Sequence, residues 1–211
     1  NILHGKNHRS LMNKSYLYIF LCVLLMGFGA SWVINTANES HDIPIIKKVP
    51  NFNFINQNGE FFSDNHLKGK ITVLDFFFTN CPGPCPIMTY NMKSLYDDFS
   101  NSEEVQFVSI TVDTKNDNIE VLKNYAKING ITDERWQLLT SDLSNIRSLK
   151  REGFMLFADE LPQGHAIKFI LIDDNQNIRK YFDGTDEASL TILKKDITNL
   201  VRELKRYEKR T

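Results

Sequence analysis

The sequence predicts an α/β sandwich built around one sheet, with an added N-terminal β-hairpin and one transmembrane helix ahead of it. Apolar runs rich in β-branched and aromatic residues alternate with segments whose apolar residues recur at helical spacing, as in α/β folds. A hairpin pattern precedes the first of these runs, and a second hairpin followed by a helix closes the chain. Residues 16–34 form an uncharged run, long enough to cross about 30 Å of hydrocarbon as a helix.

The charges around this apolar run predict how it is oriented. Residues 1–15 hold three basic residues and no acidic one, whereas the first charges after the run are acidic. The positive-inside rule therefore predicts a cytoplasmic N-terminus at 1–15, a single-pass membrane anchor at 16–34 and a globular domain on the exported side, periplasmic or equivalent. A signal peptide cleaved near residues 29–31 is the alternative. We favour the anchor because the apolar run continues through residues 32–34.

The exported part divides into a linker and a folded domain. Residues 35–49 are mostly polar and have no clear period, which predicts a linker. The domain is expected over residues 50–211. Near its start, the dipeptide Asn58-Gly59 between two apolar segments is a strong signal for a β-hairpin.

The other elements of the domain follow from short apolar runs and helical stripes. We expect strands at 71–78, 104–112, 136–140, 166–172 and 178–182, and helices at 86–99, 118–129, 142–151 and from 185–186 toward the C-terminus.

The first buried strand leads into a pair of cysteines, Cys81 and Cys85. Pro84 or Pro86 can open a helix there, because the first helical turn leaves its backbone N–H groups unpaired in any case. The dipole and the free N–H groups of a helix N-terminus favour thiolate over thiol, so we expect both sulfurs to be good ligands and nucleophiles. A dithiol at the first strand-to-helix turn makes the predicted sandwich look like a thioredoxin fold.

The spacing of the two cysteines allows two kinds of chemistry. Residues four apart on a helical turn project to the same side, so Cys81 and Cys85 can reach one metal ion. Thiolates favour soft ions such as Cu(I), although they also suit zinc. The same pair can close a disulfide, and the spacing does not decide between metal binding and redox chemistry. Cys22 lies within the predicted anchor and is interpreted as an apolar filler.

His165 favours metal binding over plain dithiol chemistry. It precedes the predicted strand at 166–172, and in a thioredoxin-like sheet the loop before that strand faces the dithiol. A neutral imidazole there would complete a three-coordinate site with two sulfurs and one nitrogen. The alternative is a loop histidine that hydrogen bonds to the backbone. The remaining histidines have no comparable placement and are expected on the surface or in the linker.

A family resemblance rests on these residues. The segment FFTNCPGPCP at 77–86 resembles the Cys-x-x-x-Cys-Pro motif of the SCO/SenC copper chaperones. His165 ahead of FILID at 169–173, and Gly184-Thr185 after it, resemble the histidine loop and the closing segment of that family. The likeness extends from the hairpin near Pro50 to the last helix.

The resemblance implies a thioredoxin-like, membrane-anchored copper metallochaperone. Its metal ligands would be Cys81, Cys85 and His165, with Cu(I) favoured and Cu(II) possible. Its partner would be the copper-receiving subunit of cytochrome c oxidase, whose binuclear copper centre it would help to assemble. The family also has an aspartate near the site, here Asp113, but the residues around it depart from the family pattern. A strand-end cap is therefore the safer interpretation of Asp113.

The alternative function is that of a membrane-anchored thiol-disulfide oxidoreductase acting on cysteines of exported proteins, with Cys81 and Cys85 as the catalytic pair. The spacing differs from the Cys-x-x-Cys of ordinary thioredoxins, which counts against this function. A peroxidase is a weaker third hypothesis, because Thr79 stands two rather than three residues before Cys81. The net charge of -1 gives no reason to expect a nucleic-acid partner.

Overall fold

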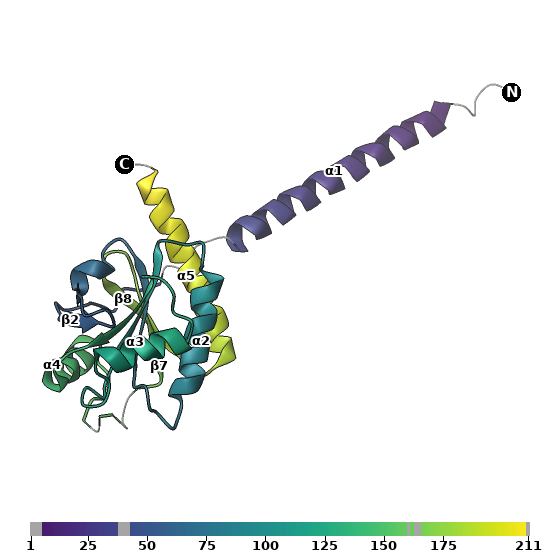
Figure 1. Ribbon diagram of the computed structural model, residues 1–211. Coiled ribbons are helices and arrows are strands. Elements are labelled where there is room, and N and C mark those ends of the chain that lie inside the picture. The colour runs from purple at the N-terminus through teal and green to yellow at the C-terminus, as the bar shows by residue number, and fades with distance from the viewer. Residues whose placement is uncertain (1–5, 38–42, 160, 163–165, 210–211) are drawn as a thin grey trace. The chain divides into compact units, whose positions relative to one another are not determined.

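A computed structural model describes residues 6–37, 43–159, 161–162 and 166–209 of the 211-residue chain (Figure 1). Within the first helix, it describes the side chains of residues 16–32. The chain divides into two compact units, Asn1–Asp42 and Ile43–Thr211.

The helix α1 (Lys6–Ala37) makes up most of the first unit and is 32 residues long. Its large apolar side chains between Tyr16 and Trp32 are exposed. Over the residues that the structure describes, no helix is both long and apolar enough to cross a membrane. The predicted anchor at 16–34 ends beyond the described side chains of α1.

A mixed sheet forms the centre of the second unit, and in the described residues it has eight strands. In chain order these are β1 (Lys47–Lys48), β2 (Asn53–Asn56), β3 (Phe61–Ser63), β4 (Ile71–Phe77), β5 (Val105–Thr111), β6 (Trp136–Thr140), β7 (Lys168–Ile172) and β8 (Asn177–Asp183). Their order across the sheet is β1-β8-β7-β4-β5-β6-β2-β3.

Strands β4, β5 and β6 run parallel, and β7 runs antiparallel to β4. Every residue of β4 and β5 is buried. This confirms the prediction that the apolar run ahead of the cysteines is a central strand covered on both faces.

Four helices and two short turns complete the described part of this unit. They are η1 (Asp64–Leu67), α2 (Cys85–Asp98), α3 (Ile119–Ile128), α4 (Leu143–Ser148), the π-helical turn η2 (Leu149–Gly153) and α5 (Glu187–Glu208). Side-chain caps begin two of the helices. The Asn118 side chain accepts a hydrogen bond from the backbone N–H of Val121 at 3.0 Å, and Asp186 accepts one from Ser189 at 2.7 Å.

Helices α2, α3 and α5 cover one face of the sheet (Figure 1). The crossovers through α2 and α3 connect parallel strands in the same direction, and right-handed crossovers then place both helices on one face. Lys194 of α5 forms an ion pair with Asp98 of α2.

The turn η2 lies on the opposite face of the sheet. Phe77 packs its ring 5.3 Å from that of Tyr125 in α3, whereas Phe76 packs 5.6 Å from Phe154, directly after η2. Successive side chains of a strand point to opposite faces, so α3 and η2 lie on opposite sides of β4.

Three local features refine the predictions. Strands β2 and β3 pair antiparallel around Gly59, whose φ of 83° suits glycine, which confirms the hairpin. Strand β1 lies within the predicted linker 35–49 and pairs with β8, so this end of the range packs with the domain. The helix expected at 142–151 continues instead as a π-helical turn. A Cβ on Gly153 would stand 2.8 Å from Cγ of Pro50, so glycine permits this close approach.

Candidate metal centre

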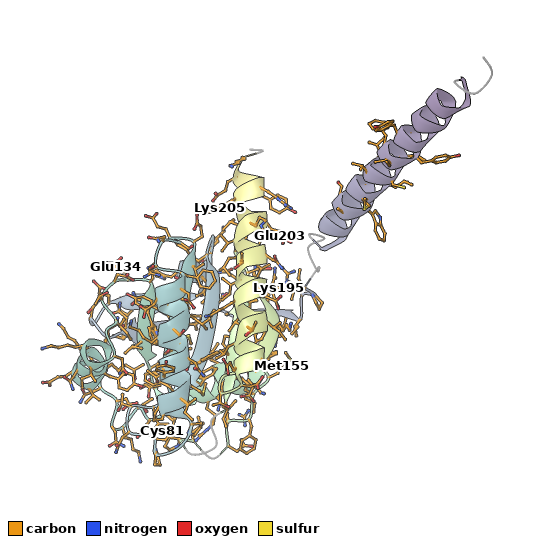
Figure 2. All side chains as sticks on the ribbon, turned by 90° about the vertical axis from the view of Figure 1, so that its right-hand side faces the viewer. Cys81, Glu134, Met155, Lys195, Glu203 and Lys205 are labelled. Carbon is orange, nitrogen blue, oxygen red and sulfur yellow. The ribbon has the colours of Figure 1, made fainter. Side chains whose placement is uncertain are left out.

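The candidate centre lies where β4 leads into α2. Cys85 is the first residue of α2 and is only 2% exposed, whereas Cys81 lies in the preceding loop and is half-buried. Figure 2 shows Cys81 at the end of the domain where α2 begins. Both cysteines are thiols that are not joined in a disulfide. The structure therefore brings the two predicted sulfur ligands to one helix N-terminus.

The two thiols interact directly. Burial, the hydrogen bond with Cys81 and the nearby charges of Cys81 and Asp75 raise the pKa of Cys85, and a backbone hydrogen bond at Phe78 only partly offsets them. The prediction that the helix N-terminus makes Cys85 a ready thiolate is therefore wrong. The cost of burying a charge is the largest contribution to this raised pKa.

A buried carboxyl group, Asp75, lies beneath the dithiol. It is 3% exposed, and among the described residues its Oδ1 has no hydrogen-bond partner. Burial raises its pKa to about 7, against a smaller lowering by the hydrogen bond with the Ser109 side chain. Ser109 stands opposite Asp75 in β5 and accepts a hydrogen bond from Trp136 Nε1 at 3.0 Å. Sequence reasoning did not single out Asp75, although an acid inside an apolar strand is a usable signal.

The Tyr125 hydroxyl also lies close to Asp75 and Cys85. It hydrogen bonds with the Thr89 hydroxyl at 2.7 Å, which links α3 to α2. Burial raises the pKa of Tyr125 to about 12, with further contributions from the charges of Asp75, Cys85 and Asp117. Asp75, Cys85 and Tyr125 therefore lie close enough for their charges to shift one another's pKa values.

His165, the predicted third ligand, lies outside the described residues. The described strand after His165 is β7, and hydrogen bonds connect its start to α2, the helix that begins at Cys85. Because β7 runs antiparallel to β4, β7 begins at the end of the sheet where β4 ends. Ile167 accepts a hydrogen bond from the Gly184 N–H at 3.2 Å, and the Gly184 carbonyl accepts one from Asn91 Nδ2 in α2 at 2.8 Å.

The other residues considered from the sequence serve local roles. Asp113 lies two residues after the end of β5, accepts a hydrogen bond from Asn116 Nδ2 at 2.8 Å, and donates its backbone N–H to the Thr111 hydroxyl. His66 accepts the Ser63 N–H at 3.0 Å within η1. In the part of the chain that the structure describes, no group of three or more His, Cys, Asp or Glu side chains forms a metal site. The predicted set of three includes one residue outside that part.

Comparisons with known proteins agree with this architecture. A family model described as SCO1/SenC matches residues 44–202. A SCO1 protein homolog of Bacillus subtilis (strain 168) is 30% identical over 152 residues, which make up 69% of this chain and 78% of that protein. These matches confirm the resemblance predicted from the cysteine motif and the histidine loop.

Solved structures extend the comparison to the fold. A SCO1/SenC family lipoprotein from Bacillus anthracis matches with a TM-score of 0.68 at 34% identity, covering 73% of this chain and 95% of that one. BsSco, a member of the Sco family of cytochrome c oxidase assembly proteins, matches with a TM-score of 0.67 at 27% identity. The match covers 75% of this chain and 96% of BsSco. Arabidopsis thaliana ScoI with copper bound has the same fold, with a TM-score of 0.61 at 22% identity. The match covers 71% of this chain and 98% of that chain.

Proposed function

Because the chain belongs to the SCO1/SenC family, we propose that it is a copper metallochaperone that assists assembly of the binuclear copper centre of cytochrome c oxidase. Copper is its cargo, carried as Cu(I) by Cys81, Cys85 and His165. The copper-receiving subunit of the oxidase is its partner. The named function of BsSco and the copper bound to the plant ScoI support this proposal.

The contact between the two thiols at the start of α2, which form no disulfide, is the observation that carries the proposal. Two neighbouring thiols that can both lose a proton suit a soft monovalent ion such as Cu(I). The anchoring of Ile167 to Gly184, and of Gly184 to α2, supports His165 as the third ligand, since His165 stands two residues before Ile167.

The different exposure of the two thiols suggests separate tasks. Cys85 is buried in the first turn of α2 and holds the ion from beneath. Cys81 is half-buried in the loop, so a donor or a receiving protein reaches it first. Each thiol gives up its proton when it binds the ion, and the ion passes on when the receiving protein supplies competing ligands.

Anaerobic titration of the reduced protein with Cu(I), against a competing chelator, tests the proposal. We expect one Cu(I) per chain, loss of this binding in Cys81→Ser and Cys85→Ser, and an affinity weakened by about tenfold or more in His165→Ala. His66→Ala is the matched control, because His66 serves the local turn η1. Equal affinities for the wild type and His165→Ala would contradict the third-ligand assignment, and retained binding in both serine variants would contradict the site.

The contrast between a reachable Cys81 and a buried Cys85 also favours a second candidate function, that of a thiol-disulfide oxidoreductase. The Cys81 thiolate would attack a partner disulfide and release one partner thiolate. Cys85 would then displace the second partner sulfur, leaving a Cys81–Cys85 disulfide and a reduced partner. A Cys85→Ser variant that traps no mixed disulfide with an oxidised peptide of the copper-receiving subunit would argue against this function.

We further propose that residues 16–34 anchor the chain as a single-pass helix, with the domain on the exported side. The uncharged run and the basic residues before it support this orientation. Carbonate extraction of membranes from expressing cells tests it. The full chain should remain in the membrane pellet and be cleaved by protease added from the exported side. Release into the supernatant would contradict the anchor.

A further inference from the structure

Asp117 is a buried carboxylate that connects the loop of Cys81 to the rest of the domain. It lies just ahead of α3 and is 1% exposed. Its Oδ1 accepts the Thr79 hydroxyl at 2.5 Å, and its Oδ2 accepts the Thr79 backbone N–H at 3.0 Å. Oδ2 also accepts the Thr111 hydroxyl at 2.5 Å. A buried carboxylate is costly unless it is well hydrogen-bonded, and these three donors provide that stabilisation.

Thr79, which is hydrogen-bonded to Asp117, lies at the start of the loop that carries Cys81. Cys85 is held by the first turn of α2, whereas Cys81 lies on the loop between β4 and α2. Thr79 stands two residues before Cys81, where the chain has just left the sheet. Asp117 holds Thr79 by both its backbone and its side chain, so it determines the point from which the loop reaches Cys81.

We propose that Asp117 is a positioning residue for the dithiol, because it fixes Cys81 relative to Cys85 through its two hydrogen bonds with Thr79. The copper consequence rests on the proposed function, but the effect on disulfide formation does not. Thr111 gives an internal comparison, because it donates to the same carboxylate from β5 without belonging to the Cys81 loop.

Four variants separate positioning from general stability, each made in the full chain with Cys22→Ser so that only the candidate pair reacts. Thr79→Val removes the hydroxyl that bonds Asp117, and Thr79→Ser keeps it. Thr111→Val removes the other hydroxyl, and Asp117→Asn weakens the acceptor for both. Each variant is measured for stability, for Cu(I) affinity and for the equilibrium of its disulfide with glutathione. In that equilibrium the two thiols pass two electrons and two protons to glutathione disulfide, which becomes two glutathione thiols.

We expect Thr79→Val and Asp117→Asn to weaken Cu(I) binding by about tenfold and to change the glutathione equilibrium constant by about threefold or more. Thr79→Ser and Thr111→Val should stay within about twofold of the parent protein in both measurements. Thr111→Val nevertheless loses a hydrogen bond to Asp117 comparable to the one lost in Thr79→Val, and it should lose stability as well. The proposal is overturned if Thr79→Val behaves like Thr79→Ser, or if Thr111→Val changes the dithiol as much as Thr79→Val does.

The two proposals can fail separately. If the parent protein binds no Cu(I), the proposed function fails and the glutathione equilibrium alone decides on Asp117. A difference between Thr79→Val and Thr79→Ser in that equilibrium then supports the positioning role, and the same constant in both variants overturns it.

Discussion

The two thiols of the candidate centre lie four residues apart in the sequence but in different surroundings. Cys85 is buried against the core, while Cys81 is half-buried in the loop. Burial and the neighbouring Cys81 and Asp75 raise the pKa of Cys85, so less of it is present as the reactive thiolate.

This difference predicts unequal alkylation. In the native reduced protein at pH 8, iodoacetamide should modify Cys81 at least about tenfold faster than Cys85, as followed by peptide mass spectrometry. In guanidinium-unfolded protein the two rates should converge, because burial and the contact between the thiols are lost. Equal rates in the native state would contradict the assigned environments.

Asp75 makes stability depend on pH. Its pKa is about 7 in the folded protein, against 3.8 for an ordinary aspartate, so the folded state binds the proton more tightly. The free energy of unfolding should therefore fall as the pH rises from about 4 to about 7, and stay low above that. The difference corresponds to roughly 4 kcal/mol at full ionisation.

The variant Asp75→Asn should remove most of this dependence. Urea unfolding at pH 5 and pH 8 should show a smaller difference in stability for Asp75→Asn than for the wild type. Glu134→Gln, a change of an exposed carboxylate, should keep the wild-type profile. A profile for Asp75→Asn that matches the wild type would show that this carboxyl group does not govern the acid-range stability.

At the scale of elements, hydrogen bonds through Gly184 connect the start of β7 to α2. Gly184 makes both hydrogen bonds of this connection. Its N–H donates to the Ile167 carbonyl, and its carbonyl accepts from the Asn91 side chain in α2. A Cβ at this position would stand 3.0 Å from Cε of Met88 and 3.5 Å from the Phe169 ring. This contact is tighter than usual for a Cβ, so a side chain here would force Met88 or the segment at Gly184 to shift.

Gly184→Ala should therefore destabilise the domain by about 1 to 2 kcal/mol and weaken Cu(I) binding, because Met88 of α2 or the segment after β8 must shift to make room for the Cβ. The same change should be less costly in a Met88→Ala background, where the crowding atoms are gone. A double-mutant cycle of urea unfolding measures this coupling. Strictly additive effects would contradict the close approach.

The elements of the domain were largely predictable from local patterns. The apolar run at 71–78 corresponds to β4, because a strand buried on both faces is apolar almost throughout. The apolar stripe at 86–99 corresponds to α2, because a helix buried on one face repeats its apolar residues at helical spacing. Strand β1 was not predictable, since a two-residue edge strand carries no period of its own. The π-helical turn was not predicted either, and Pro50, which is distant in the sequence, packs closely against its last residue, Gly153.

The candidate site was predictable only in part. The sequence places Cys81 and Cys85 together because both lie in one short motif, and the structure brings them to one helix N-terminus. His165 was predicted from the order of strands and a family resemblance, lies outside the described residues and stays a prediction. Asp117 and Asp75 act through partners on other strands and loops, so their roles emerge only when the sheet is assembled. The thiol chemistry of Cys85 was mispredicted because burial, unlike helix position, cannot be read from the motif.

At the scale of the whole molecule, the proposed function joins two units with different tasks. The folded unit Ile43–Thr211 carries the dithiol, and the N-terminal unit carries the apolar run proposed as an anchor. Under this proposal, an anchored carrier would meet a membrane-bound partner on a surface rather than in free solution, which would raise the local concentration of both. The central claim remains that copper is held by two sulfurs and one imidazole.

X-ray absorption at the copper edge of the Cu(I)-loaded chain, with Cys22→Ser, tests this claim most directly. We predict that copper in the parent protein is coordinated by two sulfur atoms and one imidazole nitrogen, and that the nitrogen contribution disappears in His165→Ala while both sulfurs remain. Identical spectra for the two proteins, or coordination by sulfur alone in the parent, would contradict it.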